Sequence, residues 1–168
     1  MQFKVGDKAV YPGHGLGKIT SIETKEILGA TQKFYSLLLT SSDMKIMVPE
    51  NQVKVVGLRS IITRKTADTV LEILQDRDTD YSLVRTGKNW SKRYQEYMKI
   101  IKTGNIVRTA QVFRELLNIE EKKGLSFYER QLMLTICKMI FDEISMIISV
   151  NELQKTFDFV GILANLKQ

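Results

Sequence analysis

The β-rich start of the chain is most evident in Phe34-Tyr-Ser-Leu-Leu-Leu-Thr40, which precedes the turn residues Ser41-Ser-Asp43 and the run Met44-Lys-Ile-Met-Val48. The first run is dense in aromatic and aliphatic residues that favour strands. In the second run, side chains alternate between the two faces of a strand, so Met44, Ile46 and Val48 are expected to face the core and Met47 to face outward. The stretch predicts two strands separated by a turn.

Shorter strand-like runs precede this stretch, between Lys4 and Tyr11 and from Lys18 to Ile27. They are separated by Pro12-Gly-His-Gly-Leu-Gly17, which superficially suggests a phosphate-binding loop. That interpretation fails because Pro12 replaces the first glycine of the motif and Ile19 replaces its Ser/Thr. The loop is therefore predicted to be a turn, with His14 at the surface. Five or so short strands in fewer than 60 residues predict a small barrel of the SH3 or Tudor kind.

After Gly57 the apolar residues follow a helical period. Ser126 and Glu129 form a capping box that opens a helix apolar nearly all round, and Ser149 and Glu152 form a second box. The remaining helices are expected at about 62–75, from Trp90 to about Lys102, and from Asn105 to Lys123. The sequence thus predicts an α+β protein of two domains, a β-barrel over residues 1–57 and an all-helical bundle over 58–168.

Composition restricts the possible functions of this 168-residue chain. Its one cysteine, Cys137, excludes an intramolecular disulfide, and its one histidine, His14, excludes a His/Cys metal cluster. Cys137 is expected to be an inert core residue. No residue pattern points to an enzyme or a cofactor. The start of the chain has no signal-peptide core and no segment is long and apolar enough for a membrane span, so the protein is expected in the cytoplasm.

Positive charge is concentrated in one segment. Residues 85–108 hold seven basic residues and one acidic residue, Glu96. The net charge of this segment, +6, equals the net charge of the whole chain. Such a segment is typical of a phosphate-binding surface, although a solvated helix face is the alternative. The basic residues are Arg85, Lys88, Lys92, Arg93, Lys99, Lys102 and Arg108.

The helix that begins at Trp90 is the most informative part of this segment. At 100° per residue, Trp90, Tyr94, Tyr97, Met98 and Ile101 form an apolar stripe, and such a stripe usually packs in a core. Two features instead favour an exposed indole: Trp90 is the first helical residue, after the expected N-cap Asn89, and the cations Lys92 and Arg93 occupy the first turn. The helix dipole disfavours cations there by about 0.3–1 kcal/mol. A phosphate backbone as ligand, with Trp90 as an apolar wedge at a DNA step, would account for both features.

Several motifs resemble the CarD/CdnL family of bacterial transcription regulators. They are Phe3-Lys-Val-Gly-Asp-Lys-Ala-Val-Tyr-Pro12, Gly13-His-Gly15, Ile22-Glu-Thr-Lys25, Val48-Pro49, Asn89-Trp-Ser-Lys-Arg-Tyr94 and Gly124-Leu-Ser126. The resemblance extends from residue 1 to about 148. The first module is also similar to the polymerase-interacting domain of the transcription-repair coupling factor.

The resemblance implies that a Tudor-like N-terminal domain binds the β subunit of RNA polymerase. It implies that Lys25, Ile27 and Met47 make this contact, although many members have arginine where this chain has Met47. It further implies that the helical domain contacts promoter DNA without sequence preference, through the residues Trp90, Lys92, Arg93 and Arg130. In that picture Trp90 inserts into the minor groove at the upstream edge of the bubble and stabilises the open complex.

Two other functions remain open at the level of sequence. A nucleoid or operator protein would bind DNA without polymerase. A barrel that reads peptides would need an aromatic cage, for which the candidates are Phe3, Tyr11, Phe34 and Tyr35. The wedge hypothesis requires the Trp90 ring to be accessible rather than enclosed in the helical core.

Overall fold

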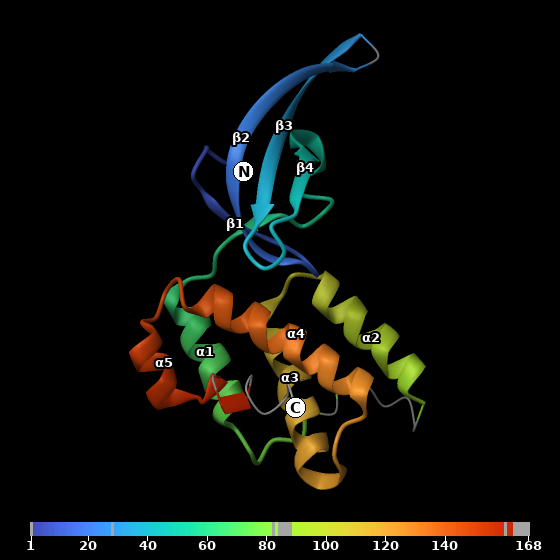
Figure 1. Ribbon diagram of the computed structural model, residues 1–168, viewed down its shortest axis with the longest axis vertical. Coiled ribbons are helices and arrows are strands. Elements are labelled where there is room, and N and C mark those ends of the chain that lie inside the picture. The colour runs from blue at the N-terminus through green and yellow to red at the C-terminus, as the bar shows by residue number, and fades with distance from the viewer. Residues whose placement is uncertain (1, 28, 82, 84–88, 160, 163–168) are drawn as a thin grey trace. The chain divides into compact units, whose positions relative to one another are not determined.

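The computed structural model describes residues 2–27, 29–81, 83, 89–159 and 161–162 (Figure 1). The chain divides into two compact units, Met1–Ile61 and Ile62–Gln168. The strands that the structure describes lie in the first unit and the described α-helices in the second, so the α+β order predicted from the sequence is confirmed. Arg59–Ser60 adds a short strand to the sheet of the first unit, and the domain boundary expected at residue 57 stays a prediction.

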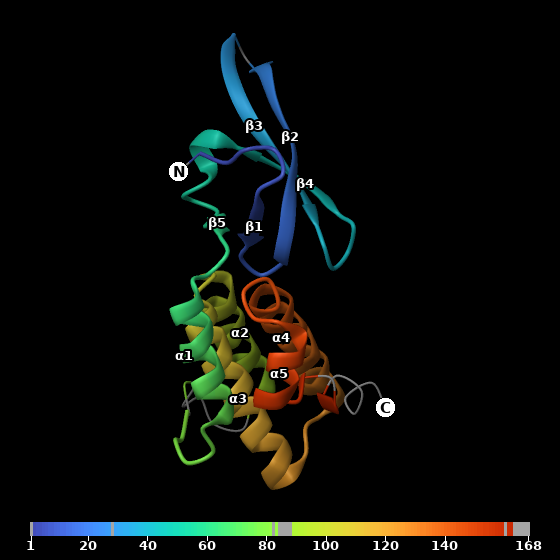
Figure 2. The same ribbon diagram turned by 90° about the vertical axis from the view of Figure 1, so that its left-hand side faces the viewer.

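The first unit is built on an antiparallel five-stranded sheet with the order β4-β3-β2-β1-β5. The second and third strands form a long hairpin that extends beyond the others, which is evident in Figure 2. Strands β4 and β5 end the order, and closure into a barrel stays a prediction. The elements are β1 (Lys8–Tyr11), β2 (Gly15–Ile27), β3 (Ala30–Leu39), β4 (Lys45–Pro49), the 3-10 helix η1 (Glu50–Gln52) and β5 (Arg59–Ser60).

One face of the sheet packs into a core. The Tyr35 ring is fully buried there, and its hydroxyl donates a hydrogen bond of 2.8 Å to Glu50 Oε1. Ile46 and Val48 of β4 contact this core, as their alternation predicted. The prediction for Met44 is wrong: its side chain is 52% exposed, because it precedes the first paired residue of β4 and the pleat does not constrain it. The buried core residues are Phe3, Ala9, Ile19, Tyr35, Leu37, Leu39, Val48, Val53 and Leu58.

The glycine-rich segment forms the turn between β1 and β2, as expected. Gly13 and Gly15 have φ values of 79° and 89°, in the left-handed region that glycine adopts without strain. His14 is exposed, and its amide donates to the Tyr11 carbonyl at 3.0 Å. Gly17 is required for a different reason, since a Cβ there would lie 2.8 Å from the Leu38 carbonyl oxygen of β3.

In its described residues, the second unit is a bundle of five helices around a large apolar core. The helices are α1 (Arg64–Gln75), α2 (Trp90–Lys102), α3 (Ile106–Lys123), α4 (Phe127–Ile144) and α5 (Val150–Thr156). Helices α2 and α4 lie beside each other (Figure 1). Helix α4 supplies six apolar residues to the buried core, consistent with its nearly uniform hydrophobic sequence: Leu132, Met133, Ile136, Cys137, Ile140 and Ile144.

Side-chain caps fix where the helices begin. Asn89 accepts a hydrogen bond from the Ser91 amide, which confirms the expected N-cap of α2. Ser126 and Glu129 form the complete capping box at the start of α4. At α5, Ser149 caps the Glu152 amide, but Glu152 Oε1 pairs with Arg64. Helix α5 ends at Thr156.

Cys137 is fully buried in the core of the bundle, and burial raises the pKa of its thiol to about 12. The thiol therefore stays protonated at neutral pH and unreactive, as the sequence predicted. Among the described residues, none of the helices combines the length and the apolar character that a bilayer crossing demands.

Candidate nucleic-acid interface

The sheet brings Lys25, Ile27 and Met47 to one face. Ser21, Ser36 and Met47 form one row across β2, β3 and β4. Because residues two apart on a strand point to the same side, Lys25 and Ile27 lie on the Met47 side, opposite the core. Ile27 and Met47 are 43% and 41% exposed, so this face offers accessible apolar surface.

Lys25 interacts with Met47 of β4 and with Glu23 of its own strand. Its Nζ lies 3.6 Å from Met47 Sδ and 3.3 Å from Glu23 Oε2. The hydrogen bond from the Ser21 hydroxyl, followed by the hydrogen bond and charge of Lys25, lowers the pKa of Glu23. Met47 lies on β4, whose backbone pairs with β3 on one side and which ends the strand order on the other. An exposed sheet edge of this kind can add a strand from a partner.

The apolar stripe of α2 divides into a buried part and an accessible part. Tyr97 and Ile101 are 0% and 3% exposed and belong to the core. Trp90 is half-buried and Tyr94 is 42% exposed, and their ring centroids lie 5.5 Å apart. The Trp90 ring is therefore packed at the margin of the core without being enclosed by it.

The accessible part of the stripe forms one wall of a groove of about 360 Å³ between α2 and α4. Tyr128, at the start of α4, is 69% exposed and lines the other wall. Contiguous apolar surface that is rimmed by polar residues can mark a ligand-binding groove or an interaction site. The described lining residues are Trp90, Tyr94, Met98, Tyr128, Gln131, Leu132 and Thr135.

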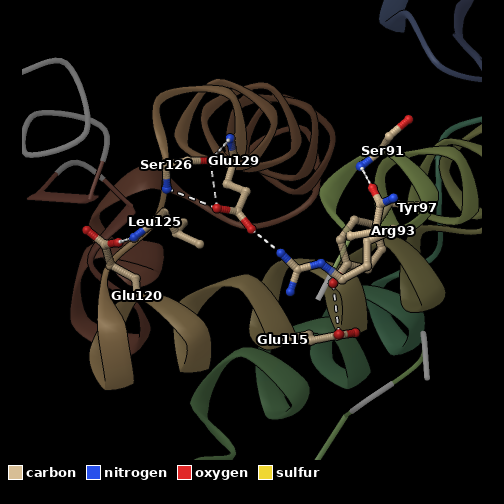
Figure 3. Close-up of polar contacts among 9 residues, drawn as sticks. Ser91, Arg93, Tyr97, Glu115, Glu120, Leu125, Ser126 and Glu129 are labelled. Atoms are coloured by element: carbon tan, nitrogen blue, oxygen red, sulfur yellow. Dashed lines mark hydrogen bonds and ion pairs between the residues drawn. The ribbon is translucent and has the colours of Figure 1, made fainter. Parts of the chain in front are cut away.

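Arg93 has a partner within the bundle. Figure 3 shows its guanidinium reaching from α2 to the Glu129 carboxylate of α4, with which it forms an ion pair. The two side chains are only 12% and 8% exposed. The unfavourable position of this cation in the first turn of α2 is therefore offset by Glu129, a partner that the sequence interpretation did not consider. The Arg93 guanidinium carbon also lies 5.8 Å from the centre of the Trp90 ring, within cation–π range.

Glu129 has two structural roles. One of its oxygens accepts from the Ser126 amide and hydroxyl at 2.9 and 2.7 Å, while the other pairs with Arg93. Burial alone would raise the pKa of Glu129, but the Ser126 hydrogen bonds and the Arg93 charge outweigh it and lower that pKa. The carboxylate therefore stays ionised at neutral pH and fixes Arg93 in place.

A second buried pair connects α2 and α3. The Tyr97 hydroxyl donates to Glu115 Oε1 at 2.8 Å, and the Leu83 amide donates to Glu115 Oε2 at 3.0 Å. Burial raises the pKa of Tyr97, and the adjacent Glu115 carboxylate adds to the effect. Burial also raises the pKa of Glu115. These contacts fix the middle of α2 against α3, and they position the accessible first turn.

The other two cations expected to contact DNA differ in their surroundings. Lys92 is exposed on the first turn of α2. Arg130 is 41% exposed and forms an ion pair of 3.4 Å with Glu120. Trp90, Lys92 and Arg93 come from one turn of α2, whereas Arg130 comes from the first turn of α4. Two residues of the basic segment, Arg85 and Lys88, lie outside the described residues.

Sequence reasoning missed the contribution of α4 to this site. Tyr128, Gln131 and Thr135 line the groove, but they are more than 30 residues from Trp90 in sequence. The capping box identified where α4 begins, but no local signal indicates that Glu129 pairs with Arg93 across two helices. Within the described residues, no group of three or more His, Cys, Asp or Glu side chains is arranged to hold a metal ion.

Comparison with known proteins assigns both units. Residues 3–62 match the family model described as the CarD-like/TRCF RID domain, and residues 69–157 match the CarD C-terminal domain. The protein described as "Putative transcription factor YdeB" of Bacillus subtilis is 30% identical over 152 residues, which cover 90% of this chain and 96% of that protein. This chain belongs to the CarD family. The resemblance inferred from the motifs is thereby confirmed.

Two solved structures are similar to parts of this chain. CdnLNt from Myxococcus xanthus is 50% identical and covers 38% of this chain and 90% of that one, with a TM-score of 0.32. The N-terminal domain of Myxococcus xanthus CarD is 34% identical, and the match covers 35% of this chain and 79% of that chain, with a TM-score of 0.31. The groove residues all lie within the matched C-terminal domain of the CarD family.

Proposed function

We propose that this protein binds the β subunit of RNA polymerase through its sheet unit and stabilises the open promoter complex through Trp90. Transcription regulation that involves RNA polymerase is supported by membership of the CarD family. The observation that most supports the finer proposal is that Trp90 is accessible beside a groove, at the start of a helix with exposed cations. The protein would act in the cytoplasm, at the nucleoid, and would not catalyse a reaction.

The polymerase contact is proposed on the sheet face that contains Lys25, Ile27 and Met47. Two exposed apolar side chains beside a lysine suit a surface that is apolar at its centre and acidic at its margin. Met47 would contribute by packing, since it cannot form the salt bridge of an arginine. Strand β4 ends the strand order of the described sheet, so its outer edge would allow a strand of the partner to extend the sheet.

Replacing Ile27 with aspartate should weaken polymerase binding at least about tenfold, because it adds a charge where apolar surface becomes buried. The matched control is Val55→Asp, since Val55 is 78% exposed in the same unit but lies outside the strands. Binding can be measured by biolayer interferometry with immobilised core polymerase. Equal affinities for wild type and both variants would refute the proposed face and favour a DNA-binding protein that acts without polymerase.

Three of the four aromatic residues considered for a peptide-binding cage are buried. Phe3, Phe34 and Tyr35 are 4%, 8% and 0% exposed. The Phe3 and Tyr35 rings belong to the sheet core. Burial of all three rings leaves no open cage among them for a cationic peptide side chain, which disfavours the peptide-reading alternative.

The proposed effect on DNA is a difference in affinity between two states of the promoter. A ligand shifts an equilibrium only as far as it binds one state better than the other. Unstacking an intact base step costs a few kcal/mol, but at the edge of a melted bubble the step is already open. A Trp90 wedge therefore binds the open state better. Tethering to polymerase raises the local concentration, so the DNA contacts themselves can be weak and independent of sequence.

Lys92 is proposed to contact a phosphate. Replacing it with alanine should reduce the slope of log affinity against log salt concentration by about one, since one fewer counterion is released. Full-length protein and a forked duplex, titrated at several potassium concentrations, provide the measurement. Replacing Lys45, exposed on β4 of the sheet unit, should leave the slope unchanged. An identical slope for wild type and Lys92→Ala would remove Lys92 from the contact surface.

A further inference from the structure

The groove between α2 and α4 has features that a Trp90 wedge alone would not require. A wedge needs one exposed apolar ring, but this groove has aromatic rings on both walls: Trp90 and Tyr94 from α2, and Tyr128 from α4. Its volume of about 360 Å³ lies within the range of small-molecule sites. Its described lining residues are uncharged, so the groove suits a planar neutral group better than a phosphate.

The remaining lining residues supply hydrogen-bonding groups. Gln131 and Thr135 are exposed on α4, one helical turn apart. The Thr135 hydroxyl donates to the Gln131 carbonyl at 2.9 Å, which leaves the hydroxyl oxygen available as an acceptor. The Gln131 side chain offers both a donor and an acceptor. Aromatic faces together with an amide and a hydroxyl match the way in which proteins hold unstacked bases.

The charges around the groove favour a nucleic acid over an apolar peptide. Helix α2 has four Lys and Arg residues and one Glu. The exposed Lys92 is in the same first turn of α2 as Trp90, about 200° around the helix axis from it, so it can attract a phosphate backbone without lining the groove. A planar ring in the groove with its phosphate outside is the arrangement that single-stranded nucleic acids adopt on proteins.

We propose that this groove binds one unpaired nucleobase, stacked against Trp90 and Tyr128 and hydrogen-bonded by Gln131 and Thr135. This inference rests on the proposed function, because the edge of an open bubble supplies such a base. In this proposal the groove holds a base that has left the DNA double helix, and Trp90 also separates the two strands. Bubble closure then requires that base to leave the groove first.

The sole tryptophan of the chain provides the test, because stacking of a base should quench its fluorescence. Full-length protein is titrated at low salt with a forked duplex that has one unpaired thymine, and with the same fork in which an abasic site replaces that base. The fork with the base should bind about tenfold more tightly, as expected for one stacked base. Equal affinity for the two forks would overturn the proposal.

Two adjacent aromatic residues serve as a matched pair of variants. Tyr128 and Phe127 are both 69% exposed, but of the two only Tyr128 is among the described groove-lining residues. Tyr128→Ala should reduce affinity for the fork with the base to that for the abasic fork, whereas Phe127→Ala should change it less than about twofold. Thermal unfolding of each variant checks that the bundle is intact, since both rings are at the surface.

The outcomes separate this inference from the proposed function. If Tyr128→Ala binds both forks as wild type does, while Trp90→Ala still shortens the lifetime of the open complex, the wedge stands and the base site is refuted. If the base-dependent affinity is present but Trp90→Ala leaves that lifetime unchanged, the groove binds a base but the proposed function fails.

Discussion

Replacing Trp90 with alanine is expected to shorten the lifetime of the open promoter complex about tenfold, to a value close to that of polymerase without the protein. Stacking of one aromatic side chain on a base contributes about 1–3 kcal/mol, and 1.4 kcal/mol corresponds to a factor of ten. Because the variant retains its sheet unit, its binding to polymerase should be unchanged. The lifetime is measured from the decay of open complexes after a heparin challenge.

Loss of the ring also removes packing against the bundle, so a control must separate contact from stability. Trp90 contacts Tyr94 and Tyr97, and it packs against the core. Trp90→Phe retains an aromatic face and should keep most of the lifetime. If Trp90→Ala remains folded at the assay temperature and the lifetime equals that of wild type, the wedge is refuted.

Replacing Glu129 with glutamine is expected to lower the free energy of unfolding of the helical unit by about 3 kcal/mol. The change leaves the Arg93 charge nearly buried without its carboxylate, and breaking a buried pair in this way costs several kcal/mol. Glutamine can still accept a hydrogen bond at the capping box, so most of the loss reflects the ion pair. Urea unfolding followed by Trp90 fluorescence measures the change.

A surface ion pair on α2, the helix that contains Arg93, provides the matched control. Lys99 Nζ lies 2.6 Å from Glu96 Oε1, but the Glu96 and Lys99 side chains are 41% and 71% exposed. Glu96→Gln should therefore cost less than about 1 kcal/mol. The double variant Arg93→Met with Glu129→Gln should regain part of the lost stability, because no unpaired charge stays buried. Equal losses for Glu129→Gln and Glu96→Gln would show that the Arg93–Glu129 pair contributes little.

The pH dependence of stability follows from the direction of the pKa shift. The folded pKa of Glu129 lies below its ordinary value of 4.5, so its stabilising contribution is complete above that pH and is lost as the pH falls through the lowered value. Glu115 acts in the opposite sense, because its raised pKa means that protonation favours the folded state. Glu129→Gln should therefore make the helical unit less sensitive to acid than wild type below pH 4.5.

The ion pair connects stability to the proposed function. Arg93 is held by Glu129 and lies against the Trp90 ring, so the pair fixes the start of α2 where the ring is presented. At a temperature where Glu129→Gln is still folded, the open complex should have a lifetime between those of wild type and Trp90→Ala. Arg93 is thus expected to position the indole in addition to any contact that it makes with DNA.

Local sequence patterns predicted most of the fold. Strand alternation identified Ile46 and Val48 as inward-facing, and capping residues located the starts of α2 and α4. Met44 was assigned incorrectly because alternation applies only where a strand is paired, and pairing of β4 begins at Lys45. The pattern could not indicate where the paired segment begins.

The candidate site was only partly predictable, because it depends on which helices are neighbours. The motif around Trp90 identified one wall of the groove, but Tyr128 and Gln131 belong to a helix whose position beside α2 is a tertiary feature. Arg93 lies in the first turn of α2, where the helix dipole disfavours a cation. The cation is compensated by Glu129, 36 residues later, which no local pattern indicates.

The central claim, that the Trp90 ring contacts DNA where the strands separate, is tested most directly with a fluorescent base. 2-Aminopurine, whose emission falls when it stacks, is placed at the upstream edge of the bubble in an otherwise natural promoter. Adding wild-type protein to the polymerase open complex should quench this base, and Trp90→Ala should leave it bright. Equal emission with the two proteins, both bound to polymerase, would contradict the account.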